Sequence, residues 1–245
     1  MLTLRRFGNA LQKRASQAKL GLKHRLSPRR KFKCAACGEP TAGFFRYGPD
    51  PNWGCPMCGA SPRERLVNVL IDGGVLSIAS SSRILQVAPT EKSLIARFSK
   101  YDLMLGDLHP HVYLPTEVQK LDLMSFGEIT DFDLIYMSHV LEHVPDDIRV
   151  LRNIYDALKP GGEVWIIVPM GTGLTEDGDL DLPASERERR FGQWDHLRLY
   201  GRDVAARIMG AGFSVREVGA ADCSPEVRSR TALSDGDVVF VGKKS

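Results

Sequence analysis

The stretch Phe132–Gly162 constrains the fold of this chain more than any other part of the sequence. It begins with a short apolar run, Phe132–Met137, of the length and branching typical of a buried strand. A polar corner, Ser138–Val144, follows, and a helix then starts at Pro145 with acids in its first turn and a Pro-Gly-Gly stop at its end. A second apolar run, Val164–Val168, comes directly afterwards. This pattern predicts a βαβ unit whose polar corner stands at the carboxyl end of a strand, where open α/β sheets bind ligands.

Strands also alternate with helices through the rest of the chain. We expect further strands at Arg83–Ala88, Tyr101–Leu105, Glu117–Leu121, Phe213–Val218 and Val238–Val241, and helices at 61–71, 90–99 and 202–209. This alternation predicts a mostly parallel, doubly wound sheet. The acidic stretch Thr175–Asp181 and the charge run Glu186–Arg190 are expected to form a mobile lid with solvated charges.

Charge is distributed unevenly along the 245 residues. Residues 1–33 hold eleven Lys and Arg and no acid, so the other 212 residues carry a net charge of −8 (+3 minus 11). Residues 1–26 have a weak amphipathic pattern that fits a membrane surface, nucleic acid, an organelle transit peptide or simply a solvated tail. With no apolar run near the roughly 20 residues of a membrane span, we expect a cytoplasmic protein with at most peripheral membrane contact through the tail.

Four of the five cysteines form two CxxC pairs. The pairs are Cys34 with Cys37 and Cys55 with Cys58, and each pair is followed by a glycine. Two such turns supply the four thiolates of a tetrahedral Zn²⁺ site with no open position, which indicates a structural metal. A redox dithiol is the alternative. The fifth cysteine, Cys223, is isolated and is interpreted as an ordinary small apolar residue.

From about Arg83 to Lys243 the sequence resembles a class I S-adenosylmethionine-dependent methyltransferase. The segments 132–144 (FDLIYMSHVLEHV) and 158–162 (LKPGG) are similar to that family's later motifs. The four cysteines, the strand Ile84–Pro89 and the block Glu186–Asp203 resemble a bacterial zinc-ribbon subgroup, the methyltransferase type 11-like proteins. The resemblance implies an α/β, Rossmann-like, doubly wound seven-stranded sheet with its seventh strand antiparallel, behind an N-terminal zinc ribbon.

The resemblance also implies positions for the methyl donor, S-adenosylmethionine. The loop after the first strand should hold the methionine part, Asp107 the ribose hydroxyls, and Asp122 the adenine. The family's Gly-rich turn is replaced by Ala88-Pro89-Thr90-Glu91, which has small residues but no glycine. The predicted donor-binding residues are Gln86, Ala88, Pro89, Asp107, Leu108, Asp122, Leu123, Ser138 and His139.

Candidate catalytic groups lie in the corner and in a second segment. His196, Arg198 and Tyr200 alternate, so in an extended segment they point to one side, which suits a hydroxylated or anionic acceptor. His196 is predicted as general base and His139 as the second choice; a structural polar network is the alternative for the three alternating residues. The spacing of His139 and His143 gives little support for a bound metal. His143 is interpreted as a residue that makes a structural hydrogen bond at the start of the helix.

We therefore expect a basic tail (1–33), a zinc ribbon (34–60), a linker helix (61–82) and a methyltransferase domain (83–245). The predicted function is O- or N-methylation of a small molecule or a glycan. One alternative is an RNA methyltransferase that binds through ribbon and tail, although an acidic body argues against a nucleic-acid channel. The other is an inactive zinc-ribbon scaffold, which the glycine-free turn favours.

Overall fold

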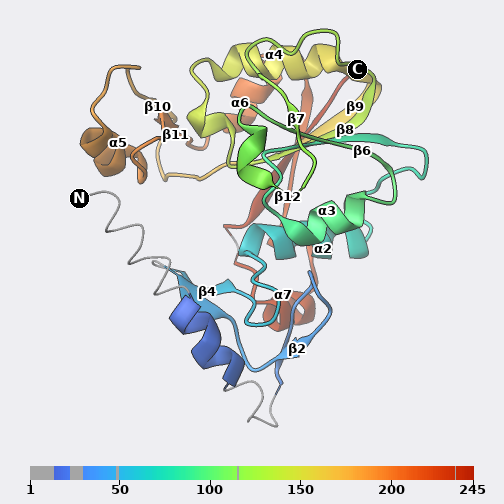
Figure 1. The fold of residues 1–245 in the computed structure, drawn as a ribbon, viewed down its shortest axis with the longest axis vertical. Coiled ribbons are helices and arrows are strands. Elements are labelled where there is room, and N and C mark those ends of the chain that lie inside the picture. Colours follow the sequence, from blue (N-terminus) through green and yellow to red (C-terminus); the bar gives the residue numbers. More distant parts are fainter. Residues whose placement is uncertain (1–13, 23–29, 48–49, 115, 235) are drawn as a thin grey trace. The chain divides into compact units, whose positions relative to one another are not determined.

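The computed structural model describes residues 14–22, 30–47, 50–114, 116–234 and 236–245 (Figure 1). The chain divides into two compact units, each built from separate stretches. The ribbon unit combines Met1–Ser77 with Glu91–Arg97 and Val218–Val238, and the sheet unit combines Ile78–Thr90 with Phe98–Glu217 and Val239–Ser245. The linear division into tail, ribbon, linker and methyltransferase domain stays a prediction beside this discontinuous one.

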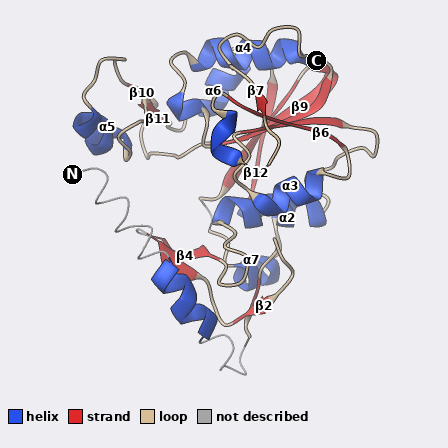
Figure 2. Cartoon of the chain, in the orientation of Figure 1, coloured by secondary structure: helices blue, strands red, loops and turns tan. Residues whose placement is uncertain are grey.

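A seven-stranded sheet is the central element, as predicted (Figure 2). Its strands are β5 (Arg83–Val87), β6 (Asp102–Asp107), β7 (Gln119–Lys120), β8 (Phe132–Ser138), β9 (Leu158–Ile167), β12 (Ser214–Gly219) and β13 (Val238–Lys243). Their order is β12-β13-β9-β8-β5-β6-β7. The pairs from β9 through β8, β5 and β6 to β7 are parallel, and β13 runs antiparallel to β9. The expected antiparallel seventh strand is therefore confirmed.

Helix α4 (Asp147–Ala157) follows β8 as the pattern predicts. Asp146 caps it by accepting a hydrogen bond from the Arg149 amide, and its buried face, which includes Val150 and Ile154, packs on β9 and α6 (Val204–Met209). The chain becomes extended at Leu158, where it pairs with the first residue of β8. The Pro-Gly-Gly segment therefore forms an irregular start of β9 rather than a separate turn.

Two helices differ from expectation. Helix α5 (Ala184–Phe191) occupies the charge run predicted as part of a mobile lid with solvated charges. Its charges are paired: Glu186 with Arg189 one turn away, and Arg190 with Glu176. Helix α7 (Pro225–Thr231) was not anticipated, although Ser224 caps it. The remaining helical elements are α2 (Pro62–Asp72), α3 (Lys92–Phe98), η1 (Pro110–Tyr113), η2 (Leu141–His143) and η3 (Ala220–Asp222). A small sheet pairs β10 (Glu176–Asp177) with β11 (Arg198–Leu199).

The ribbon unit holds two short hairpins. They pair β1 (Phe32–Lys33) with β2 (Pro40–Thr41) and β3 (Phe45–Tyr47) with β4 (Asp50–Gly54). Residues 14–22 are helical, and the rest of the amphipathic pattern predicted over 1–26 lies outside the described residues. Among the helices that the structure describes, none is both long and apolar enough to cross a membrane.

Candidate functional site

Four neighbouring parallel strands of the sheet unit finish at the same end of the sheet. Val87 at the end of β5 pairs with Met137 of β8 and with Gly106 of β6, and Asp107 pairs with Lys120 of β7. The predicted donor residues that follow these strands are therefore neighbours in space. These are the carboxyl ends of the parallel strands, where open α/β sheets bind their ligands.

The turn after β5 has the backbone shape of a glycine turn without a glycine. Ala88 has φ 48°, in the left-handed region, and its amide donates to the Gly106 carbonyl at 2.9 Å. A Cβ added at Gly106 would stand 2.8 Å from the Leu121 side chain, so a larger residue there would force that side chain to move. Alanine has the smallest side chain after glycine. The turn therefore keeps the backbone shape that lets a ligand approach closely.

Asp107 ends β6 with a half-buried carboxylate. It accepts hydrogen bonds from the His109 amide at 2.6 Å and from the Tyr113 hydroxyl at 2.9 Å. A carboxylate offers about four lone-pair positions, so the hydroxyls of a ribose can still be accepted. Tyr113, on η1, was not recognised in the sequence because its contact with Asp107 depends on how the segment after β6 folds.

The other predicted donor residues differ in accessibility. Asp122 accepts from the Met124 amide at 2.8 Å and stands beside the buried Leu123. Leu108 is exposed, whereas Gln86 is completely buried within β5. Ser138 is also buried, and its Oγ has no hydrogen-bond partner in the part of the chain that the structure describes. Among the described residues, its hydrogen-bonding capacity is therefore unused.

The corner after β8 brings a buried carboxylate next to imidazoles. His139 has φ 56°, and its Nδ1 lies 3.1 Å from Oε1 of Glu142, which is completely buried. His196 reaches the same place from the segment before β11, and its ring lies edge-on to that of His143 with centroids 4.8 Å apart. Burial lowers the pKa of His196, against the attraction of the nearby Glu142 carboxylate, and so favours the neutral imidazole.

Arg198 and Tyr200 form a closed polar network instead of facing an open acceptor site. The Arg198 guanidinium donates to the carbonyls of Leu141, Val144 and Pro145 at 2.6–3.0 Å and to Asp177 at 2.8 Å. Both side chains are nearly fully buried. The contacts favour the structural alternative for these two residues, with Arg198 holding the corner in shape.

Tyr200 belongs to the second half of this network. Its hydroxyl donates to Asp147 at 2.8 Å, and Arg207 also donates to Asp147 at 2.8 Å. Burial and the Asp147 carboxylate raise the pKa of Tyr200 well above its ordinary value, so the phenol stays protonated. In the sequence pattern Asp147 is only a first-turn acid, because Tyr200 and Arg207 lie more than fifty residues away.

The four cysteines of the CxxC pairs converge in the ribbon unit, as predicted. Their Sγ atoms lie within 4.8 Å of one another, with Cys34–Cys58 at 3.8 Å and Cys37–Cys55 at 3.9 Å. A tetrahedral zinc with Zn–S bonds of about 2.3 Å separates its sulfurs by roughly 3.8 Å. The arrangement therefore fits a four-thiolate zinc site.

The two cysteine turns have the same geometry. The amide of Gly38 donates to the Cys34 carbonyl at 2.8 Å, and that of Gly59 donates to the Cys55 carbonyl at 2.9 Å. Both glycines have left-handed φ, 75° and 81°. Hydrogen bonds among these sulfurs lower the pKa of Cys55 and raise the pKa of Cys34 and Cys58, so the negative charge of the cluster lies on Cys55.

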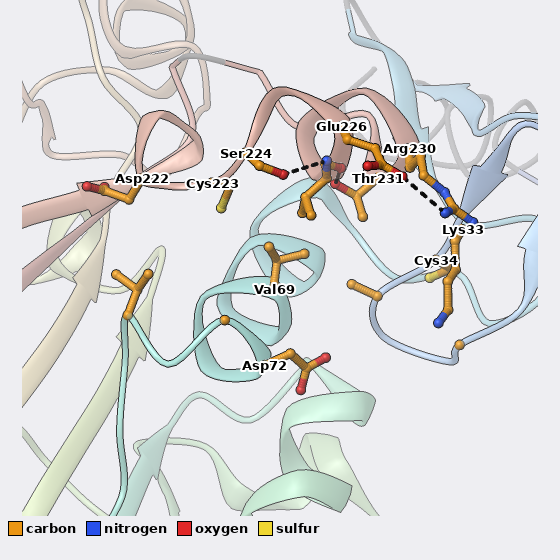
Figure 3. A pocket seen from close by; sticks show the side chains of 15 residues that line it. Lys33, Cys34, Val69, Asp72, Asp222, Cys223, Ser224, Glu226, Arg230 and Thr231 are labelled. Atoms are coloured by element: carbon orange, nitrogen blue, oxygen red, sulfur yellow. Dashed lines mark hydrogen bonds and ion pairs between the residues drawn. The ribbon is translucent and has the colours of Figure 1, made fainter.

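A pocket of about 490 Å³ also lies in the ribbon unit (Figure 3). Val69 of α2 and Cys223, just before α7, lie toward one another across it, with Lys33 and Asp72 at its margin (Figure 3). None of the residues that line it belongs to the predicted donor or acceptor groups. Cys223 is partly buried there, in keeping with its interpretation as a small packing residue.

The sheet order and the strand-end groups together define the fold of S-adenosylmethionine-dependent methyltransferases. A solved example from Archaeoglobus fulgidus, a SAM-dependent methyltransferase, is similar with a TM-score of 0.50 and 14% identity over 74% of this chain and 94% of that one. The family model described as "Methyltransferase domain" matches residues 50–211, well over half of the chain. The chain belongs to this methyltransferase domain family.

Curated relatives match shorter stretches. The ubiquinone biosynthesis O-methyltransferase of Xanthomonas campestris pv. campestris (strain B100) is 31% identical over 107 residues, which are 44% of each chain. Phosphoethanolamine N-methyltransferase 2 of Caenorhabditis elegans is 38% identical over 52 residues, 21% of this chain and 12% of that one. The chain thus spans less than half the length of the curated relatives it matches.

Proposed function

We propose that the chain transfers the methyl group of S-adenosylmethionine to a hydroxyl or amino group of a small acceptor. The observation that carries this proposal is the alignment of Ala88, Asp107 and Ser138 at the ends of three adjacent strands. The left-handed turn leaves room for the methionine part, Asp107 accepts hydrogen bonds from ribose hydroxyls, and Leu123 offers an apolar wall for adenine. The side chains present therefore fit the donor.

A small acceptor is favoured over RNA on two grounds. The relatives are named for ubiquinone biosynthesis and for phosphoethanolamine, which are small molecules. The chain beyond residue 33 has a net charge of −8, and a nucleic-acid channel should be basic. A glycan or sugar acceptor remains within the proposed class.

The chemistry asks for few groups. The donor's sulfonium is already activated, so the protein has to align the acceptor oxygen or nitrogen with the methyl carbon and remove one proton. His196 and His139 are the proposed proton acceptors. Because burial lowers the pKa of His196, its imidazole is neutral at pH 7 and able to take a proton.

Calorimetric titration with S-adenosylmethionine tests donor binding. We expect saturable heat with the unaltered protein and at least about tenfold weaker binding for Asp107→Asn, since a charge-assisted hydrogen bond contributes about 1.5–3 kcal/mol. Asp102→Asn is the matched control, because Asp102 lies at the opposite end of the same strand. Absence of heat and of a thermal shift at millimolar donor would contradict the methyltransferase proposal and favour the scaffold alternative.

We also propose that the ribbon binds structural zinc through Cys34, Cys37, Cys55 and Cys58. Four thiolates leave no open coordination position, so the metal stabilises the ribbon and takes no part in methyl transfer. Elemental analysis should find one zinc per chain, lost in Cys58→Ser and kept in Cys223→Ser. Equal zinc contents in the two variants would refute the assignment.

A further inference from the structure

Glu142 is a buried carboxylate whose close ion-pair partner is a histidine, His139. It is completely buried, and neither side-chain oxygen makes a hydrogen bond to any residue that the structure describes. The adjacent His139 Nδ1, at 3.1 Å, is close enough for an ion pair but lacks hydrogen-bond geometry. Burying a charge without compensation costs several kcal/mol, roughly, so a positive group belongs next to these oxygens.

Two imidazoles face the same carboxylate in the protonation state that binds metals. Nδ1 of His196 lies 2.9 Å from the Phe191 carbonyl, and Nδ1 of His143 lies 3.3 Å from the Asp195 carbonyl. A carbonyl only accepts hydrogen bonds, so each Nδ1 carries a proton, and Nε2 is the nitrogen that could bind a metal. Nε2 of the buried His196 has no partner among the described residues.

We propose that Glu142, His143 and His196 bind a divalent metal ion. One ligand atom from each residue can be chosen so that all three lie within 4.8 Å of one another. Ligands bonded at about 2.1 Å to one ion stand up to roughly 4.2 Å apart, so small side-chain adjustments close the site. His143 is exposed while the other two are buried, which gives the ion an entry route from solvent.

The surrounding contacts hold the ligands in register. The Leu197 amide donates to the Glu142 carbonyl at 2.7 Å and fixes the segment of His196 against η2. Arg198 is a positioning residue, because its hydrogen bonds to three carbonyls of the corner set the path of the chain on both sides of His143. Such outer partners are usual around metal-binding histidines.

The ligand set distinguishes this ion from the ribbon zinc. Two imidazoles and one carboxylate suit Mn²⁺, Fe²⁺ or Co²⁺, whereas four thiolates select soft ions. Three protein ligands leave open positions, as in catalytic rather than structural centres.

This inference deepens the proposed function, on which its catalytic role rests. An acceptor hydroxyl bound to the ion loses its proton to solvent more readily, because the ion stabilises the oxyanion. The oxygen then attacks the methyl carbon, the carbon–sulfur bond breaks, and its electron pair stays on sulfur as neutral S-adenosylhomocysteine. The expected acceptors are therefore hydroxylated compounds that can chelate a metal. With the ion bound, the Nε2 lone pair of His196 is used as a ligand, so the acceptor proton leaves to solvent or to His139 and not to His196.

The site is tested by titrating the protein with Mn²⁺ alone. Binding is monitored as the loss of the electron paramagnetic resonance signal of free Mn²⁺. Mn²⁺ has little affinity for thiolates, so the full zinc-loaded chain can be used. We expect one Mn²⁺ per chain and a loss of affinity in Glu142→Gln and His196→Ala greater than the roughly 10–100-fold typical of an outer partner. His111→Ala is the control, because His111 lies on η1 beside another histidine and outside the proposed site.

The results separate the inference from the proposed function. Glu142→Gln keeps the shape of the side chain, and its circular dichroism shows whether a lost affinity is a folding defect. Mn²⁺ binding that is absent, or equal in Glu142→Gln and His111→Ala, overturns the metal site. Calorimetry with S-adenosylmethionine on the same samples tests donor binding separately. Donor binding without Mn²⁺ binding overturns the metal site and leaves the proposed function supported.

Discussion

At the residue scale, two side-chain-bearing residues hold left-handed backbone at neighbouring strand ends. Ala88 and His139 follow β5 and β8 with φ of 48° and 56°. This conformation costs about 1 kcal/mol or more for a residue with a Cβ, and it persists only where the surrounding contacts fix it. The His139 amide is fixed by the Ile167 carbonyl at 2.8 Å. Strain of this kind collects at ligand sites, which agrees with the proposed donor position.

Replacing Ala88 by glycine should raise stability. Glycine relieves the left-handed strain, so we expect Ala88→Gly to raise the free energy of unfolding by up to about 1 kcal/mol in urea titrations. Ala79→Gly, at an exposed loop position without positive φ, should lower it by about 0.4–1 kcal/mol through the entropy of the unfolded chain. The same sign in both variants would show that Ala88 is not strained.

Spacing along the chain determines which site residues can be recognised from sequence. The two cysteines of each pair are three positions apart and share one tight turn, so the four-cysteine cluster could be predicted from the sequence. Glu142 and His196 are 54 residues apart in the sequence, and only the fold brings them together. The pattern His139–His143 therefore suggested a metal weakly and missed the carboxylate that gives the cluster its charge.

At the element scale, Asp147 ties α4 to α6 and to the small β10–β11 sheet. Burial alone would raise its pKa, but the hydrogen bond from Arg207, the charge of Arg198 and the hydroxyl of Tyr200 outweigh burial and lower it. Arg198 and Arg207 also pair with Asp177 of β10. One acid in the first turn of α4 thus holds Arg198 and Tyr200, in and next to β11, together with Arg207 of α6.

The lowered pKa of Asp147 predicts acid sensitivity. A carboxyl whose folded pKa is below its unfolded value of about 3.9 stabilises the fold above that value and loses this effect as the pH falls through the folded pKa. We expect Asp147→Asn to be less stable at pH 7 and to lose less stability on acidification, measured by urea unfolding between pH 3 and 7. Asp156→Asn, at an exposed position of the same helix, controls for the removed charge.

The elements that were predicted well are those with strong apolar runs. β5, β8 and the later part of β9 are buried on both faces, so their sequences consist mostly of apolar residues. Helix α5 was missed because its seven residues before Phe191 are mostly charged and its stability comes from ion pairs one turn apart. Short amphipathic helices such as α7 carry too little periodicity for detection.

At the scale of the whole molecule, the ribbon unit is assembled around one buried guanidinium. Arg65 of α2 is completely buried and donates to the carbonyls of Asn52, Trp53, Ala60 and Thr231 at 2.8–3.2 Å. Its guanidinium also stacks on the Phe44 ring, 4.0 Å from the centroid. One side chain thus links α2 to β4, to Ala60 after the second cysteine pair and to the last residue of α7.

Truncating Arg65 should destabilise the ribbon unit strongly. Arg65→Met leaves several buried carbonyls without partners, so we expect a loss of at least about 3 kcal/mol in the free energy of unfolding. Arg97→Met is the control, because Arg97 pairs with the exposed Asp72 and its loss should cost less than about 1 kcal/mol. Denaturant titration monitored by the fluorescence of Trp53, which lies in β4, provides the measurement.

The bond between Arg65 and Thr231 spans 166 residues of chain, and this has a consequence for synthesis. At about 5–20 residues per second, a ribosome takes roughly 8–33 s to add the second partner after the first. The four cysteines are translated before the strands of the sheet, but the unit to which they belong closes only when α7 emerges. The ribbon unit is therefore begun before the sheet and completed after most of the sheet strands have been made.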